Sequence, residues 1–278
     1  MLQLIAAAGL LLASQADELA ASRVDRLPAV GGRADDEAWK AAKELSLGID
    51  LPGEDALRKK ISLKAVHDGT SISLLIVWSD PDRSGDHTPF RLNGDVYEED
   101  GEKLEDGCVV AFALDGKFDS DMKAGVESSW DVWEWGAART PDGFARDRRH
   151  VYSFAKPEGM PSRRLTTRGG GPNFFSRPDD ARTPADVQVL APETKGPPQV
   201  LQHRPQAPAG SAADGRAKGE WAAGAWTLEL QRRLDTGHQD DAVLAPGKTV
   251  EFALATFDKS EKGDHEVTRT VALRILEK

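Results

Sequence analysis

After residue 45 the sequence is a succession of short segments in which apolar and polar residues alternate, separated by turn residues, with no long stretch of helical periodicity. Alternation with a period of two is typical of strands that bury one face. Residues 61–66 and 71–78 flank an Asp68-Gly69 turn and predict a hairpin. Many short strands with turn punctuation predict a mainly β domain, an antiparallel β-sandwich.

Two segments interrupt this pattern. Asp35 and Asp36 are suitable caps for a short N-terminal helix that begins near Glu37 and carries Trp39 inward. Residues 156–218 hold most of the prolines and a Gly-Gly-Gly run, and predict a long irregular insertion. We also expect residues 82–107 to form a solvated loop. Further strands are expected at residues 108–114, 147–155, 220–233, 248–257 and 267–276.

The N-terminus indicates export. Residues 1–16 are mostly apolar and end in Ser-Gln-Ala, which predicts a signal peptide cleaved after Ala16 and a periplasmic or otherwise exported protein. No Lys or Arg precedes the apolar run, so an ordinary amphipathic helix is the alternative. No later run is long enough to span a bilayer. The net charge of −10 argues against nucleic acid as a partner.

The sequence lacks the motifs that several kinds of chemistry require. Cys108 is the single cysteine and lies in an apolar strand, so the chain has no disulfide framework, no cysteine zinc site and no C-x-x-C-H for covalent haem. The sequence also lacks G-x-S-x-G, H-E-x-x-H, a P-loop and a dinucleotide fingerprint. We therefore do not expect an enzyme with its own catalytic centre.

Residues 122–139, MKAGVESSWDVWEWGAAR, hold three of the seven tryptophans. On a strand, Trp133 and Trp135 share one face and Trp130 takes the opposite face. So much indole on one strand requires a large partner. A hydrophobic core, a sugar and a flat cofactor all remain open as that partner.

Four stretches together resemble one family: GGRADDEAWKAA, LKAVHDGTSISLLIVWSDP, WDVWEWGAAR, and GAWTLELQRRLDTG followed by LAPGKTVEFALATFDKS. Their order and spacing are similar to those of the ethylbenzene-dehydrogenase-type haem-binding domain, also described as cytochrome c-552/DMSO-reductase-like. The resemblance runs from about residue 25 to the C-terminus except for the insertion. It predicts one domain over residues 24–278.

The resemblance implies a sandwich of the DOMON and family 9 carbohydrate-binding type. The γ-subunits of periplasmic molybdenum oxidoreductases, which belong to this family, hold one haem b between a methionine and a lysine. The expected function is therefore an exported haem b-binding electron-transfer domain or subunit, with the haem held non-covalently. Its expected partners are iron–sulfur or molybdenum oxidoreductase subunits or a membrane cytochrome.

The resemblance also implies site residues. Met122 occupies the position of the methionine that precedes the tryptophan strand, and His265 stands where the γ-subunits have the lysine ligand. Lys262 and Lys259 are the alternatives to His265. Thioether and imidazole are both iron ligands. Arg139 is the candidate partner for the haem propionates.

In this interpretation Trp130, Trp133 and Trp135 cover the porphyrin. The alternative is a non-haem binding module of the same fold, in which these indoles stack on carbohydrate or the surface binds a protein partner. A family member with a purely structural role is a third hypothesis. His67 and His238 are expected in turns, and the sequence pattern pairs neither His87 nor His150 with another residue.

Overall fold

The computed structural model describes residues 17–49, 59–85, 87, 90–93, 96–99, 104–140, 143–178, 182–187, 199–200, 203–259 and 265–278. The predicted signal segment, residues 1–16, and the alternative ligand Lys262 lie outside the described residues. Within them, no helix is long and apolar enough to cross a membrane.

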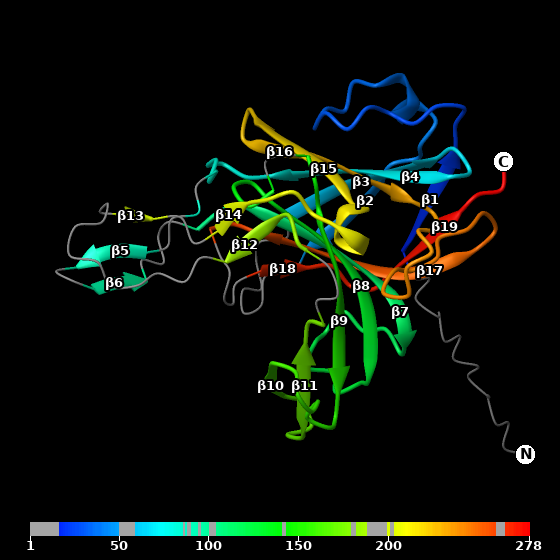
Figure 1. Cartoon of the computed structure of the whole chain (residues 1–278). Coiled ribbons are helices and arrows are strands. Elements are labelled where there is room, and N and C mark those ends of the chain that lie inside the picture. The colour runs from blue at the N-terminus through cyan, green and yellow to red at the C-terminus, as the bar shows by residue number, and fades with distance from the viewer. Residues whose placement is uncertain are drawn as a thin grey trace, which may run out of the picture.

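The described chain is mainly β (Figure 1). Its strands are β1 (Glu18–Arg23), β2 (Leu45–Ile49), β3 (Lys59–His67), β4 (Ser71–Ser79), β5 (Phe90–Asn93), β6 (Val96–Glu99), β7 (Gly107–Gly116), β8 (Ser128–Gly136), β9 (Arg146–Ser153), β10 (Ser162–Thr166), β11 (Pro172–Ser176), β12 (Ala185–Val187), β13 (Gln199–Val200), β14 (His203–Pro205), β15 (Arg216–Ala222), β16 (Ala225–Arg233), β17 (Thr249–Phe257), β18 (His265–Val267) and β19 (Val271–Ile275).

One long sheet folds onto itself. Its strand order is β10-β11-β9-β8-β7-β17-β19-β1-β3-β4-β16-β15, with β18 added beside β17 and β2 beside β3. All of its pairs are antiparallel except those of β1, which runs parallel to both β19 and β3. An isolated bridge between Phe144 and Arg216 brings the chain just before β9 next to the start of β15. The two halves therefore form the two layers of a sandwich.

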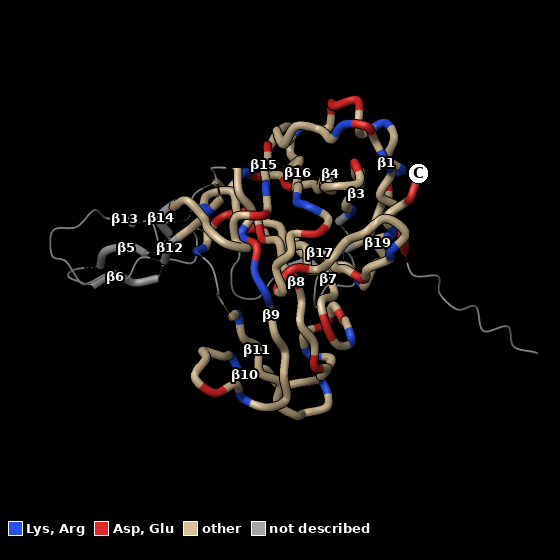
Figure 2. The backbone as a smooth tube through the Cα atoms, turned by 45° about the vertical axis from the view of Figure 1, so that its right-hand side comes forward, with Lys and Arg blue, Asp and Glu red and all other residues tan. Residues whose placement is uncertain are grey.

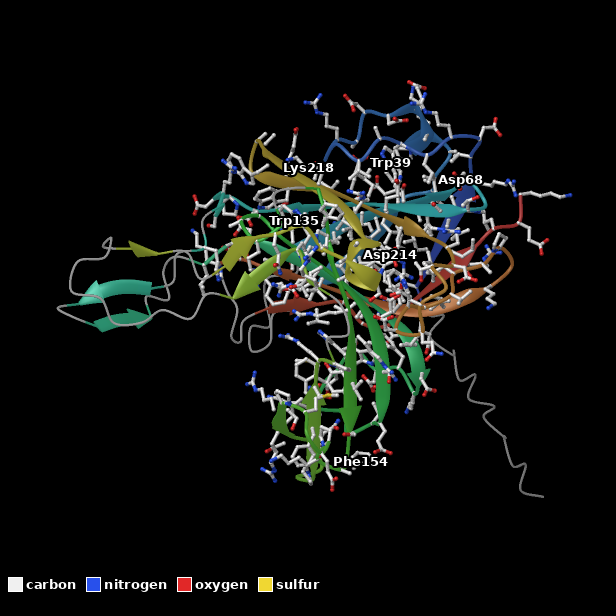
Figure 3. The ribbon with its side chains drawn as sticks, viewed as in Figure 1. Trp39, Asp68, Trp135, Phe154, Asp214 and Lys218 are labelled. Atoms are coloured by element: carbon white, nitrogen blue, oxygen red, sulfur yellow. The ribbon has the colours of Figure 1, made fainter. Side chains whose placement is uncertain are left out.

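The main core lies between these layers. Trp135 on β8 meets Trp226 on β16 with ring centroids 5.0 Å apart, and it meets Trp78 on β4 at 6.3 Å. In Figure 3 the labelled Trp135 lies in the body of the sandwich. Leu, Ile, Val and Phe side chains from both layers complete this core. The alternation in the sequence thus correctly predicted a mainly β sandwich.

The predicted N-terminal helix is a single 3-10 turn, Glu37–Lys40. The Asp36 carboxylate accepts a hydrogen bond from the Ala38 backbone N–H, and Trp39 is buried, as the capping pattern predicted. The helix packs on the outer side of the β3–β4 layer, where Trp39 joins Val66 and Leu75 in a small separate core.

The structure corrects several segment predictions. The sheet includes β1, whose buried Leu19 and Ala21 precede the expected boundary at residue 24. The insertion at 156–218 contains regular structure, because β10 and β11 extend the main sheet and β12 pairs with β14. The expected loop at 82–107 contains β5 and β6. His67 is not a turn residue; it ends β3, fully buried, with Nε2 2.7 Å from the Leu276 carbonyl oxygen.

Candidate functional site

The tryptophans of β8 lie on two faces, as the alternation predicted. Trp133 and Trp135 point into the main core, and their side chains are almost fully buried. Trp130 lies on the outer face of the same layer and belongs to a second apolar cluster. Trp133 and Trp135 are thus core residues between the layers, and only Trp130 lies on the face that carries Met122.

We call this second cluster the outer cluster. It comprises Ala111, Phe118, Trp130, Val132, Tyr152 and Ala253, with Val109, Ala113, Met122, Leu165 and Phe175 packed against it. Its rings are in close contact: the Trp130 centroid lies 4.3 Å from that of Tyr152 and 5.2 Å from that of Phe118. The β10–β11 hairpin, which hangs below the main body in Figure 1, supplies Leu165 and Phe175.

Met122 reaches this cluster from the loop between β7 and β8. The loop is tied to the β10–β11 turn, because the Arg168 N–H donates to the Lys123 carbonyl oxygen at 2.9 Å. Arg168 also pairs with Asp121. These contacts place the methionine thioether, half-buried, against an aromatic surface. The sequence predicted this residue as a site residue, and its local environment is apolar.

His150 is a candidate site residue that the sequence analysis did not assign. It pairs with Trp130 in the β8–β9 register, so the two share the outer face. Its ring meets Phe175 edge-on with centroids 4.9 Å apart. His150 is buried, and among the described residues its Nε2 has no hydrogen-bond partner. Burial, with Arg148 and Arg177 nearby, lowers its pKa well below the usual 6.5, which keeps the imidazole neutral.

Four arginines continue this face beyond His150. Arg139, Arg146, Arg148 and Arg177, which we call the arginine group, surround the half-buried carboxylate of Glu134. Burial alone would raise the pKa of Glu134, but Arg148, Arg146 and Arg139 together hold it well below the usual value. Basic residues along β9 are visible as the blue segments of Figure 2. The protein is acidic overall, so this basic group is a local feature.

Arg139, the predicted propionate partner, has carboxylate partners of its own. Its Nε donates to Glu105 Oε1, and its Nη1 lies 3.4 Å from Glu134 Oε1. Glu105 Oε2 in turn accepts the backbone N–H groups of Ala138 and Arg139. His87 is buried with its Nδ1 3.6 Å from Glu105 Oε1. Arg139 thus lies at the edge of the arginine group, engaged with two carboxylates.

The described strands do not bring His265 to Met122. The backbone of His265 pairs with Phe257, and Phe257 pairs with Gly107 at the start of β7. The Met122 loop instead follows Gly116 at the other end of that strand. The His265 side chain lies outside the described part, so its role stays a prediction. Lys259, an alternative ligand, has its Nζ 3.6 Å from an Asp82 carboxylate oxygen.

Two other clusters of ionisable residues are held together by their own ion pairs. Inside the sandwich, Arg232 pairs with Asp131, Asp147 and Asp241. At the surface, His238 Nδ1 lies 2.7 Å from Asp214 Oδ2, in the predicted turn. These groups lie away from the outer cluster.

The sequence contained a usable signal for the outer-face site. In β9, RDRRHVYS, the alternation places Arg146, Arg148, His150 and Tyr152 on one face. This pattern could be linked to the outer cluster only from the strand register, which places the β9 face beside Trp130.

Taken together, the chain is a mainly β sandwich with an apolar, aromatic outer face that carries a thioether, a neutral imidazole and a basic group. The sequence model of the ethylbenzene dehydrogenase family matches residues 36–268, and the chain belongs to this family. This confirms the resemblance found in the sequence.

A search of curated protein sequences finds no match. Among solved structures, the chain is similar to a family 9 carbohydrate-binding module from Caldicellulosiruptor kristjanssonii in complex with glucose, with 10% identity, a TM-score of 0.40, and coverage of 94% of this chain and 97% of that chain. It is also similar to a putative carbohydrate-binding protein from Bacteroides uniformis, with 10% identity, a TM-score of 0.42, and coverage of 94% and 99%. Likenesses this distant carry no functional argument.

Proposed function

We propose that this protein binds haem b without a covalent bond and transfers electrons as a domain or subunit of an exported oxidoreductase. The observation that carries the proposal is that Met122 packs against the apolar outer cluster, whose sheet face also carries the buried imidazole of His150. Family membership supports the proposal, because the γ-subunits of periplasmic molybdenum oxidoreductases, which the sequence resembles, hold haem b. The iron–sulfur, molybdenum or membrane-cytochrome partners predicted from the sequence remain part of this proposal.

The side chains present fit such a group. Thioether sulfur and neutral imidazole nitrogen are both iron ligands. The buried His150 Nε2 has no hydrogen-bond partner among the described residues, and such an atom needs a ligand. The aromatic rings of the outer cluster would exclude water from a porphyrin. A bound haem would supply a one-electron couple, whose potential thioether ligation raises. The protein would hold and orient the haem and keep water away from it.

The second ligand has two histidine candidates, His265 from the family position and His150 from the structure, and Lys262 and Lys259 remain the alternatives to His265. Replacing each histidine with alanine distinguishes the two candidates by the effect on the haem spectrum. Met122→Ala and the correct histidine-to-alanine change should each convert a low-spin haem to high spin or release it. The other histidine change should leave the spectrum unaltered. His238→Ala is the control, because that imidazole is exposed and pairs with Asp214.

The test is an absorption spectrum of protein purified from the periplasm, oxidised and then reduced with dithionite, with a pyridine haemochrome. Sharp reduced α and β bands of the b type are expected. A protein that is colourless as purified, and that also gives no shifted Soret band when titrated with ferric haem, would overturn the proposal.

Carbohydrate stacking has less support from this structure. Six of the seven tryptophans are buried: Trp39, Trp78, Trp130, Trp133, Trp135 and Trp226. Trp221 is half-buried, and its Nε1–H donates to the Asp80 carbonyl oxygen at 2.9 Å. A sugar platform needs an exposed indole face, and the described tryptophans do not provide one.

A further inference from the structure

Among the described residues, the arginine group has more guanidinium groups than carboxylates to pair with them. Glu134 is shared among Arg139, Arg146 and Arg148. Arg177 forms no ion pair with a described carboxylate, and its guanidinium carbon lies 4.9 Å from the centroid of the Phe175 ring. At the outer cluster, Arg148 therefore has only the shared carboxylate of Glu134, and Arg177 has no described carboxylate partner.

This excess is unfavourable for the protein alone. Arg148 is buried, and among the described residues its Nε has no hydrogen-bond partner. Arg177 is exposed, and its guanidinium lies over the ring of Phe175. A buried guanidinium is costly unless all of its donors are paired, because it has lost its contacts with water. An anion beside these two guanidinium groups would remove that cost.

The atoms around this position suit a carboxylate that belongs to a larger apolar molecule. Tyr152 is buried, and its hydroxyl has no hydrogen-bond partner among the described residues. Phe175 connects the two sides of the face, because it stacks on Tyr152 with centroids 5.1 Å apart and also lies under Arg177. A guanidinium binds a carboxylate through two parallel N–H donors. The apolar rings would contact the rest of the ligand.

We infer that Arg148 and Arg177 form a carboxylate-binding site that holds the propionate groups of the haem. This inference rests on the proposed function and makes it specific. It replaces Arg139, which is engaged with Glu105 and Glu134, as the propionate partner predicted from the sequence. Arg148 and Arg177 act by binding and orienting the ligand and take no part in iron ligation.

The experiment compares three probes by titration of the full chain: ferric haem, its dimethyl ester, and iron-free protoporphyrin IX. The ester lacks the carboxylates, whereas protoporphyrin IX keeps them but offers no iron to Met122 or a histidine. Wild-type protein should bind ferric haem at least about tenfold more tightly than the ester, the factor that corresponds to one charge-assisted hydrogen bond.

Arg148→Met and Arg177→Met should each weaken binding of ferric haem and of protoporphyrin IX by about tenfold or more. They should leave the affinity for the dimethyl ester unchanged. Arg177→Met breaks no ion pair among the described residues, so it serves if Arg148→Met does not fold. Arg164→Met is the matched control, because Arg164 is exposed on the neighbouring strand β10. Arg148→Lys should restore part of the lost affinity.

The outcomes distinguish failure of the carboxylate site from failure of haem binding. Equal affinities for haem and its ester in the wild type, or equal losses for both in the arginine variants, overturn the carboxylate site while haem binding stands. Binding of protoporphyrin IX that depends on Arg148, with no shifted Soret band on adding ferric haem, supports the site and overturns iron ligation. Failure to bind either haem or protoporphyrin IX overturns both.

Discussion

Glu229 shows how a single residue can differ from its local pattern. It alternates with apolar residues along β16, which predicts a solvent-facing side chain, but it is buried. One carboxylate oxygen accepts backbone N–H groups of Gly31 and Gly32 at 2.7 and 2.8 Å, and the other accepts Trp39 Nε1–H at 2.9 Å. The charge is satisfied by donors from a segment almost 200 residues away in sequence.

Glu229→Gln should therefore destabilise the protein. An amide keeps the shape but offers one acceptor oxygen, so at least one of these charge-assisted hydrogen bonds is lost. We expect a decrease of about 1.5–3 kcal/mol in the free energy of unfolding, measured by urea denaturation. Glu220→Gln, at an exposed position of the neighbouring strand, should change it by less than about 0.5 kcal/mol. Similar effects of the two variants would show that the Glu229 contacts contribute little.

At the scale of elements, the segment predicted as one strand at residues 220–233 contains most of a hairpin. β15 ends at Ala222 and β16 begins at Ala225, and the turn between them has positive φ at Ala223 (51°) and Gly224 (79°). A hairpin turn of this kind usually has Asn or Asp at its first position, so Ala223 did not indicate a turn.

The glycine in β15, Gly219, is required for close packing. A Cβ at Gly219 would lie 2.3 Å from Trp135 Cζ2.

Gly219→Ala should weaken the packing of β15 on β8. The added methyl group would overlap the indole of Trp135, which is fixed between Trp78 and Trp226. Overpacking of this kind costs about 1–3 kcal/mol, and thermal unfolding should show a correspondingly lower Tm. Gly169→Ala is the control, because its nearest neighbour would be 3.9 Å away. An unchanged Tm for Gly219→Ala would mean that Trp135 has room to move.

At the scale of the whole molecule, Arg232 joins the two layers from inside. It lies on β16 with no exposed side-chain area, and its Nη1 contacts Asp131 Oδ2 on β8 at 2.7 Å and Asp147 Oδ2 on β9 at 3.3 Å. Asp241 Oδ1 lies 3.2 Å away. The guanidinium also packs 4.7 Å from the Trp133 ring centroid. One cation thus holds three carboxylates from different parts of the chain.

Arg232→Met should be strongly destabilising, by about 3–5 kcal/mol, because three buried carboxylates would lose their counter-charge. Chemical denaturation at pH 8 measures this effect. Arg233→Met, the exposed neighbour on the same strand, is the matched control and should be near neutral.

The penalty for Arg232→Met should shrink at acidic pH. Burial, with Asp131 close by, raises the pKa of Asp241 to about 6, and Arg232 opposes this rise. A raised carboxyl pKa means that the folded state binds the proton more tightly than the unfolded chain. The resulting stability is present below about pH 4 and is lost as the pH rises through about 6. Protonated carboxyls need no counter-charge, so the same penalty at pH 5 and pH 8 would contradict this account.

The sequence by itself determined the class of fold and several local details. Its period-two alternation predicted a mainly β sandwich, its Asp36 capping pattern predicted the short helix, and its motifs identified the family. It also placed Trp130 opposite Trp133 and Trp135. These features are encoded within a few residues of chain, because strand faces, caps and tight turns depend on local geometry.

Only the tertiary structure decided which faces meet. Strand register placed His150 beside Trp130, and the β10–β11 hairpin brought Phe175 and Arg177 to the same face. Register and layer contacts join residues far apart in sequence, and a local pattern does not specify its distant partner. For that reason the class of fold and the candidate Met122 could be predicted from the sequence. The positions of His150, Arg148 and Arg177 around the outer cluster could be found only in the folded chain.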